Sequence, residues 1–128
     1  MAGEMVLVVD DNPINLKLVK VLLSLEGYNV QTAIDAKETI KILKTFRPNL
    51  ILMDIQLPGM DGLELTRIIK AAPLLKNIII VALTAYAMKG DDEKAFAAGC
   101  DGYIAKPIDT QSLPKLIASY LEKNKTPE

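Results

Sequence analysis

Three carboxylates stand directly after two apolar segments of the chain. Asp10 and Asp11 follow the run Met5 to Val9, and Asp54 follows Leu50 to Met53. Apolar runs without alternation fit strands that are covered on both faces, as in the middle of a parallel sheet. The carboxyl ends of such strands share one edge of the sheet, where open α/β folds bind ligands. We therefore expect the three acids to lie together.

An acidic cluster of this kind needs a cation. Two carboxylates ~4 Å apart repel each other by about 1 kcal/mol in water and by about 4 kcal/mol at an effective dielectric of 20. Oxygen ligands select a hard ion, and Mg2+ fits because it takes one or two carboxylates and leaves positions for waters and phosphate oxygens. An aspartate after a strand can also be only a turn former or a helix cap. Two such strand ends in one chain favour the metal site.

Two further strand ends add a hydroxyl and a cation. Thr84 follows the apolar segment Ile78 to Leu83, and the pair Lys106 and Pro107 follows Tyr103 to Ala105. A threonine or a surface lysine alone is ordinary. Acids, a hydroxyl and an ammonium at the ends of several parallel strands together indicate a site for a charged ligand.

The elements that must position these residues alternate between strand and helix patterns. A further strand is expected at Asn29 to Ala33. Pro and Gly residues mark where the helical segments between the strands begin and end. The expected helices begin at Pro13 and stop at Gly27, begin at Asp35 and stop before Pro48, span about Leu63 to Ala72 and about Lys89 to Ala98, and end near Glu122.

Pro114 decides where the last helix begins. A cap at Asp109 or Thr110 would place the proline where it removes a helical hydrogen bond, whereas a cap at Ser112 places it in the first turn. We therefore expect Ser112 to be the cap. Five parallel strands with helical crossovers predict an α/β fold, a doubly wound three-layer (βα)5 sandwich. The chain is expected to be a single domain, 1–128, with a core of about 5–122.

Several apolar side chains are expected to face the core of this sandwich. Helical spacing puts Ile40 and Leu43 on one buried stripe, and the next helix has its own stripe. The members of that second stripe are Leu65, Ile68, Ile69 and Ala72, and a weaker stripe before Gly99 contains Ala95, Phe96 and Ala98.

Composition excludes several classes of function. The 128 residues are 50% hydrophobic, and 15 Lys+Arg balance 16 Asp+Glu, so no basic footprint for nucleic acid is present. Apolar runs are too short for a membrane span and no leader pattern opens the sequence, so we expect a cytoplasmic protein. Histidine is absent, which excludes a histidine phosphodonor, base or metal ligand in this chain. The single cysteine, Cys100, is expected to be a small buried hydrophobe.

Four motifs carry a resemblance to a known family. They are Val-Val-Asp10-Asp11-Asn, Leu-Met-Asp54-Ile-Gln-Leu-Pro-Gly-Met-Asp-Gly, Leu-Thr84-Ala and Ala-Lys106-Pro107. In order and spacing they resemble the receiver domain of two-component response regulators, over essentially the whole chain. The resemblance implies the flavodoxin-like strand order 2-1-3-4-5. The stretch after Thr84 is similar to that of single-domain regulators of phosphorelays.

The resemblance also implies roles for the site residues. Asp54 would accept the phosphoryl group from a histidine kinase or a histidine phosphotransfer protein. Asp11 would bind Mg2+ directly, Asp10 through water and Gln56 through its backbone carbonyl. The phosphoryl oxygens would be held by Thr84 and Lys106. The chain would catalyse only its own phosphorylation and dephosphorylation.

A switch is implied as well. In this family the threonine hydroxyl moves toward the phosphoryl group and an aromatic side chain of the fifth strand swings inward, which changes the binding of a downstream effector. Thr84 and Tyr103 match these positions. Tyr103 could instead be a static, half-buried aromatic. Gln56 and Tyr86 flank the pocket and would set how easily water reaches the acyl phosphate.

Three other classes of function are alternatives to this one. A phosphatase of the haloacid dehalogenase type needs an Asp-x-Asp pair, but Gln56 stands at that spacing after Asp54. A flavin-binding flavodoxin needs a Ser/Thr/Gly-rich loop after the first strand, which is missing. A pure binding module that is never phosphorylated stays possible, although the set of acceptor residues argues against it.

The first helix has more apolar residues than packing against a sheet needs. They span an arc of roughly 220°, whereas one buried stripe needs about 100°. We expect Leu16 to lie on the exposed edge and, with the loop at Pro107, to bind the helices that carry the donor's phosphohistidine. Burial on two sides, or scattered surface leucines, is the alternative. The apolar set is Ile14, Leu16, Leu18, Val19, Val21, Leu22, Leu23 and Leu25.

Overall fold

Five parallel strands form one sheet in the order β2-β1-β3-β4-β5. The computed structural model describes residues 3–57, 59–84, 91–105 and 108–125, without the side chains of 91–92 and 123–125. The strands are β1 (Met5–Val9), β2 (Asn29–Ala33), β3 (Leu50–Asp54), β4 (Ile79–Thr84) and β5 (Gly102–Ala105). Every neighbouring pair of strands is parallel. The predicted α/β fold and its strand order are confirmed.

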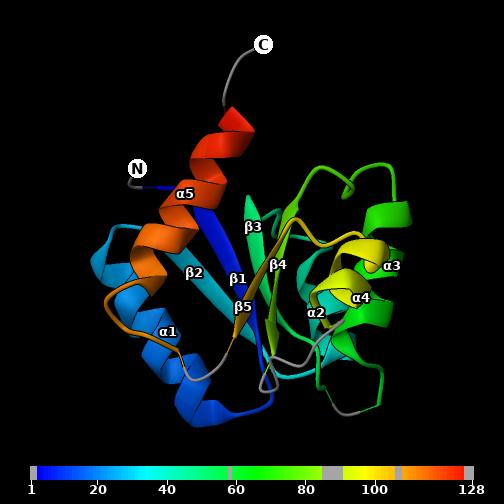
Figure 1. The fold of residues 1–128 in the computed structure, drawn as a ribbon, viewed down its shortest axis with the longest axis horizontal. Helices are drawn as coiled ribbons and strands as arrows, with labels where there is room; N and C mark the ends of the chain where they lie inside the picture. Colours follow the sequence, from blue (N-terminus) through cyan, green and yellow to red (C-terminus); the bar gives the residue numbers. More distant parts are fainter. Residues whose placement is uncertain (1–2, 58, 85–90, 106–107, 126–128) are drawn as a thin grey trace.

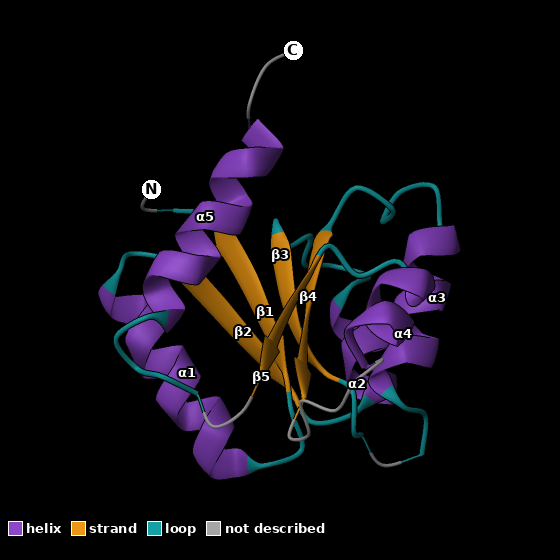
Figure 2. Cartoon of the chain, viewed as in Figure 1, coloured by secondary structure: helices purple, strands orange, loops and turns teal. Residues whose placement is uncertain are grey.

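Helices cover both faces of the sheet. They are α1 (Pro13–Leu25), α2 (Ala36–Ile42), α3 (Gly62–Ala71), α4 (Asp91–Ala98) and α5 (Leu113–Lys125). Figure 1 shows α1 and α5 on one face and α2, α3 and α4 on the other, and Figure 2 shows the same three layers by type of element. No helix in the described part of the chain is long and apolar enough to cross a lipid bilayer.

The hydrophobic core divides into two clusters, one on each face of the sheet. Side chains alternate along a strand, so Val6 and Val8 of β1 join the cluster under α1 and α5, while Leu7 and Val9 join the other. All five residues of β3 are buried. This two-sided burial explains why β3 reads as an unbroken apolar run that ends in an acid.

Three helix starts follow the predicted signals, whereas the last helix ends at Lys125, three residues beyond Glu122. Asn12 caps α1 directly before Pro13, and its side chain accepts hydrogen bonds from the N–H groups of Ile14 and Asn15. Asp35 caps α2 by accepting from the N–H of Glu38 at 2.8 Å. The last helix begins at Leu113, so Pro114 falls in its first turn as predicted from a cap at Ser112.

Two strand boundaries differ from the prediction in a way that matters for the site. Asp54 and Thr84 are the last residues of β3 and β4 rather than the first residues after them. Strand geometry therefore holds the backbone of both residues. β4 begins at Ile79 and not at Ile78, while β5 begins one residue early, at Gly102.

Three apolar side chains predicted to face the core are exposed instead. Ile40 of α2 is 40% exposed, Ile68 of α3 is 45% exposed and Phe96 of α4 is 51% exposed. Helical spacing predicts one apolar stripe but does not say how far the neighbouring elements reach across it. Leu43, Leu65 and Ile69 are buried as predicted.

Candidate functional site

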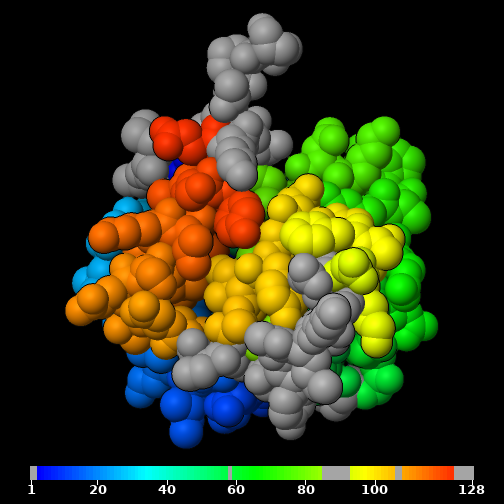
Figure 3. Space-filling view, in the orientation of Figure 1, coloured from blue at the N-terminus to red at the C-terminus, as the bar shows by residue number. Residues whose placement is uncertain are grey.

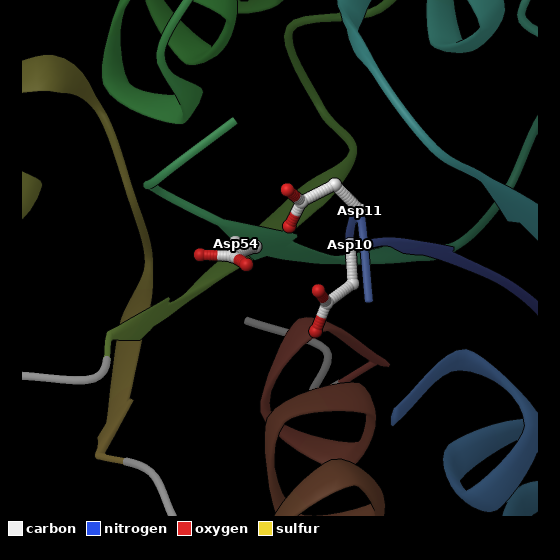
Figure 4. Close-up of side chains that lie close together, drawn as sticks. All are labelled: Asp10, Asp11 and Asp54. Atoms are coloured by element: carbon white, nitrogen blue, oxygen red, sulfur yellow. The ribbon is translucent and has the colours of Figure 1, made fainter. Parts of the chain in front are cut away.

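The three predicted acids come together at the carboxyl edge of the sheet. Asp10 and Asp11 follow β1, and Asp54 ends the neighbouring strand β3, so the two strand ends stand side by side. One carboxylate oxygen from each acid lies within 4.8 Å of those from the other two. Figure 4 shows the three side chains around one small space. Asp10 and Asp54 are buried, whereas Asp11 is exposed.

Asp10 is held by the start of α1. The N–H of Asn12 donates to Asp10 Oδ1 at 2.9 Å, and the amide of Asn15 donates to Oδ2 at 3.4 Å. Because Asn12 is also the cap of α1, one residue ties the helix and the carboxylate together. The acid therefore keeps its position through the fold of the β1–α1 turn.

Asp54 is fixed by its own loop. Its side chain is 1% exposed, and its Oδ1 accepts a hydrogen bond from the N–H of Gln56 at 2.9 Å. This bond sets the rotation of the carboxylate at the end of β3. An Asp side chain commonly accepts a hydrogen bond from the N–H two residues further on and so stabilises a turn. Asp54 therefore forms this turn and also belongs to the acidic cluster.

Gly62 lets α3 press against the backbone that carries Asp54. A Cβ added to this residue would overlap the carbonyl oxygen of Asp54, and it would lie 2.7 Å from the Cα of Ile55. The N–H of Gly62 donates to the carbonyl of Ile55 at 3.0 Å. Gly62 is the first residue of α3, directly after the cap Asp61, and no local sequence pattern indicates this close approach.

Thr84 is the last residue of β4, the strand that pairs with β3 and its terminal Asp54. It is 1% exposed, and β4 pairs with β3 so that Leu83 stands opposite Asp54. On its other side β4 pairs with β5, where Ala82 stands opposite Tyr103. Paired residues of neighbouring strands share a face, and so do alternate residues of one strand, so Thr84 and Tyr103 belong to the same face of the sheet.

β5 is an edge strand that is flanked by two helices. Figure 3 shows its residues reaching the surface between α4 and α5. A Cβ on Gly102 would overlap the ring of Tyr120, so α5 packs directly on the backbone of this strand. Tyr103, the next residue, is half-buried.

The remaining predicted site residues divide into two groups. Gln56 lies in the loop after Asp54 with an exposed side chain. Lys106, Pro107 and Tyr86 lie outside the described residues.

The acidic cluster fits a hard divalent cation. Three carboxylates this close repel one another, and each pair at 4.8 Å costs about 1 kcal/mol in water and about 3.5 kcal/mol at an effective dielectric of 20. The donor atoms are oxygens only, which suits Mg2+ better than softer metals. One exposed acid beside two buried ones leaves the space open to solvent and to a ligand.

The predicted exposure of Leu16 is wrong. The side chain is 8% exposed and belongs to the core cluster with Val19 and Leu23. The expected excess of apolar surface on α1 exists, but it lies on the other edge of the apolar arc. Its members are Ile14, Leu18, Val21 and Leu25.

The fold, the acidic cluster and the order of the strand ends define a class of protein. The chain belongs to the response regulator receiver domains, whose family model matches residues 6–118. It is therefore a module of two-component signalling rather than a metabolic enzyme, and receiver domains interact with histidine kinases. The resemblance inferred from the four motifs is confirmed.

Individual relatives narrow the placement further. The chain is 42% identical to the polar-differentiation response regulator DivK of Brucella anthropi over 116 residues, which cover 91% of this chain and 94% of that protein. It is 41% identical to DivK of Brucella ovis over the same shares. The narrower likeness expected from the sequence, to single-domain regulators of the DivK type, is confirmed.

Solved structures agree with this placement. The receiver domain of a sensor histidine kinase from Pseudomonas aeruginosa, solved with a magnesium ion coordinated in the active site cleft, matches with a TM-score of 0.85 and 35% identity, covering 94% of this chain and 99% of that one. A CheY-like receiver domain protein from Methanospirillum hungatei matches with a TM-score of 0.87 and 33% identity, covering 97% and 98%.

Proposed function

We propose that this chain accepts a phosphoryl group from a partner's phosphohistidine onto Asp54 and changes its binding of a downstream effector through Thr84 and Tyr103. The observation that carries the proposal is the meeting of Asp10, Asp11 and Asp54 within 4.8 Å at the carboxyl edge of the sheet. Asp54 is the acid that ends the central strand β3, with Thr84 on the strand beside it.

The proposed transfer uses the carboxylate of Asp54 as the nucleophile. An oxygen of Asp54 attacks the phosphorus in line with the bond to the donor's imidazole. A P–O bond forms, the P–N bond breaks, and the imidazole keeps the electron pair and takes up a proton. The hydrogen bond from the N–H of Gln56 holds the carboxylate in one rotamer. The entropy cost of orienting the nucleophile is therefore already met before the reaction.

A metal site belongs to this proposal. Asp10, Asp11 and Asp54, with the backbone carbonyl of Gln56, would hold Mg2+. When bound, the ion supplies positive charge against the charge that develops on the phosphoryl oxygens. The hydroxyl of Thr84 and the ammonium of Lys106 are proposed to hold those oxygens, and the exposed Gln56 side chain to limit the entry of water with Tyr86.

The proposed switch is a shift between two positions of the aromatic side chain on β5. Tyr103 is half-buried, so it has both a packed side and a solvent side in the structure. Thr84 shares its face of the sheet, two positions along from the partner residue of Tyr103. Phosphorylation can act only by stabilising the inward position more than the outward one.

Labelling by acetyl phosphate with Mg2+ tests the acceptor. The parent protein should gain one phosphoryl group in intact-mass spectrometry, and Asp54→Asn should gain none while keeping its melting temperature within a few degrees. Asp61→Asn is the matched control, because Asn caps a helix as well as Asp and only an exposed carboxylate is lost. Equal labelling of Asp54→Asn would refute the assignment. A folded parent that takes no label would instead indicate a pure binding module.

The donor is proposed to dock on the exposed row of α1. Ile14, Leu18, Val21 and Leu25 lie at intervals of four, three and four residues, the spacing of one helix face. Ile14 stands at the end nearest the acids, since α1 begins directly after them. Such a row fits the apolar seam of a helix from a histidine kinase or phosphotransfer protein.

Two matched substitutions test this docking surface. Ile14→Gln should slow transfer from a phosphohistidine donor at least tenfold and leave acetyl phosphate labelling unchanged, because only the macromolecular contact is lost. Leu25→Gln, at a similar exposure but about 16 Å further along the helix, should slow it less than threefold. If both substitutions slow transfer equally, or if neither slows it, the proposed position of the donor on α1 is refuted. Leu16→Gln should unfold the protein, since that side chain is core.

A further inference from the structure

A groove separates α2 from α3 on the face of the sheet opposite α1. Its volume is about 340 Å3, and apolar side chains make up most of its lining. The main contributors are Ile40 and Leu43 from the α2 side, Ile68 and Ala72 from the α3 side, and Leu74 from the loop beyond α3. Ile40 and Ile68 are two of the side chains that the periodicity places in the core and the structure leaves at the surface.

The groove continues into a second hollow at the amino edge of the sheet. This hollow, of about 410 Å3, shares Arg47 and Leu74 with the first and adds Pro48, Asn49, Asn77 and Ile78. Leu74 therefore stands at the junction of the two, with 82% of its surface exposed. A leucine this exposed, beside a concave apolar surface, is typical of a site for a macromolecular partner.

The two segments that supply most of the lining are rich in basic residues, of which Lys44 and Arg47 line the groove itself and Lys70 pairs with Asp101. Residues 36–47 and 62–76, which form its two walls, contain Lys37, Lys41, Lys44, Arg47, Arg67, Lys70 and Lys76 but only Glu38 and Glu64. That is seven cations and two anions, a net charge of +5, on a chain whose total is −1. The rest of the chain therefore carries −6.

The basic residues that line the groove come from the segment directly after α2. Lys44 and Arg47 are both in the lining, and no acidic side chain is. Arg47 donates to the carbonyl of Leu43 at 2.9 Å, which holds its guanidinium beside the groove. The two acids of the walls belong to the first turns of α2 and α3, at the other end of these helices.

We propose that this groove binds an amphipathic helix with acidic flanks, supplied by a partner protein. The lining of Ile40, Leu43, Ile68 and Leu74 takes the apolar face of such a helix, and Lys44 with Arg47 pairs its carboxylates. The hollowed shape favours a helix over a lipid surface, which needs a protruding apolar segment and not a concave one.

This surface is separate from the proposed phosphoryl site. Helices follow the carboxyl ends of the strands, so α2 and α3 begin near the acids and their last turns lie toward the amino edge of the sheet. The lining contains none of the residues assigned to phosphoryl transfer or to the docking row of α1. The groove can therefore be tested on the unphosphorylated protein.

A designed peptide serves as the probe. It has 15 residues, with leucine at helical positions i, i+3, i+4, i+7 and i+11, glutamate and alanine elsewhere, and blocked termini. Its binding is measured by fluorescence anisotropy and located by 15N amide chemical shifts. We expect binding with shifts confined to residues 36–47 and 62–78, and at least tenfold weaker binding of the same peptide with lysine in place of glutamate. Equal affinities, or shifts centred on α1, would overturn the proposal.

Variants of the protein give the second arm of the test. Leu74→Glu and Lys44→Glu should each weaken the binding of the acidic peptide at least tenfold, while Leu116→Glu, at an exposed position of α5 outside both surfaces, should change its affinity less than twofold. Both groove positions are exposed, so circular dichroism should show an unchanged fold. If all three variants bind alike, the groove is not the site. If the protein does not bind the peptide but sediments with phosphatidylglycerol vesicles, the surface binds a membrane and the proposal is overturned.

Discussion

Replacing Asp11 by Asn should make the metal-free protein more stable. The carboxylate oxygens of Asp10, Asp11 and Asp54 lie within 4.8 Å of one another, so each ionised pair repels by at least about 1 kcal/mol even with the screening of water. Asp11 is exposed, and the water-like figure is the appropriate one for its two pairs. The substitution removes both, which should stabilise the fold by about 2 kcal/mol. For 128 residues this corresponds to a rise in melting temperature of about 7 °C.

The same substitution should remove the response to Mg2+. A ligand present at ten times its dissociation constant stabilises the native state by about 1.4 kcal/mol, or about 5 °C for a chain of this size. The parent should show this rise, because Mg2+ offsets the repulsion of the empty cluster. Asp11→Asn loses a proposed direct ligand, so its melting temperature should change by less than about 1 °C.

Thermal melts in EDTA and in MgCl2, followed by circular dichroism, measure both effects. Glu26→Gln is the matched control, because it removes one exposed carboxylate at the far end of α1 and leaves the cluster intact. It should show the parent's response to Mg2+ and only a small rise in EDTA. The reasoning is refuted if Asp11→Asn melts below the parent in EDTA, or if its Mg2+ response equals that of Glu26→Gln.

Two further predictions concern the face that contains α3. Lys70 donates to the carbonyl of Ile78 and pairs with Asp101, both at 2.8 Å, so Lys70→Met should cost about 1–3 kcal/mol in chemical denaturation, whereas Lys44→Met should cost under about 0.5. If both substitutions lower the free energy of unfolding equally, the contacts of Lys70 with Ile78 and Asp101 do not stabilise the fold as inferred. Burial raises the pKa of the Cys100 thiol above its usual value, so iodoacetamide at pH 8 should alkylate the native protein at least 100-fold more slowly than the unfolded one. Since the unfolded thiol ionises first, stability should also fall as the pH rises above 9, and this fall should be absent in Cys100→Ala.

The acidic cluster could be predicted because strand ends are strong signals. Apolar runs that stop at Asp10 and Asp54 place both residues at one edge of a parallel sheet, and the register of β1 against β3 only refines that position. The close approach at Gly62 could not be predicted, since it depends on how steeply α3 leaves the sheet. The clamp between Lys70 and Asp101 joins residues 31 positions apart, and no local pattern links them.

The error at Leu16 has a geometric cause. At about 100° per residue from Ile14, Leu16 lies near 200°, at one edge of the apolar arc, and Ile14, Leu18, Val21 and Leu25 gather near the other edge. The width of the arc shows that one edge must face solvent. Which edge does so depends on where β1 and α5 lie relative to the helix, and that is a property of the fold.

The docking row on α1 and the groove between α2 and α3 lie on opposite faces of the sheet. The row on α1 begins beside the acids, whereas the groove occupies the last turns of α2 and α3, near the amino edge. A partner on the groove would therefore leave both the approach to Asp54 and the docking row open. Because α3 begins at Gly62, against the carbonyl of Asp54, a shift of α3 along its axis on partner binding would press on the backbone of the acceptor. The groove and the acceptor site therefore share one helix, α3, at its two ends.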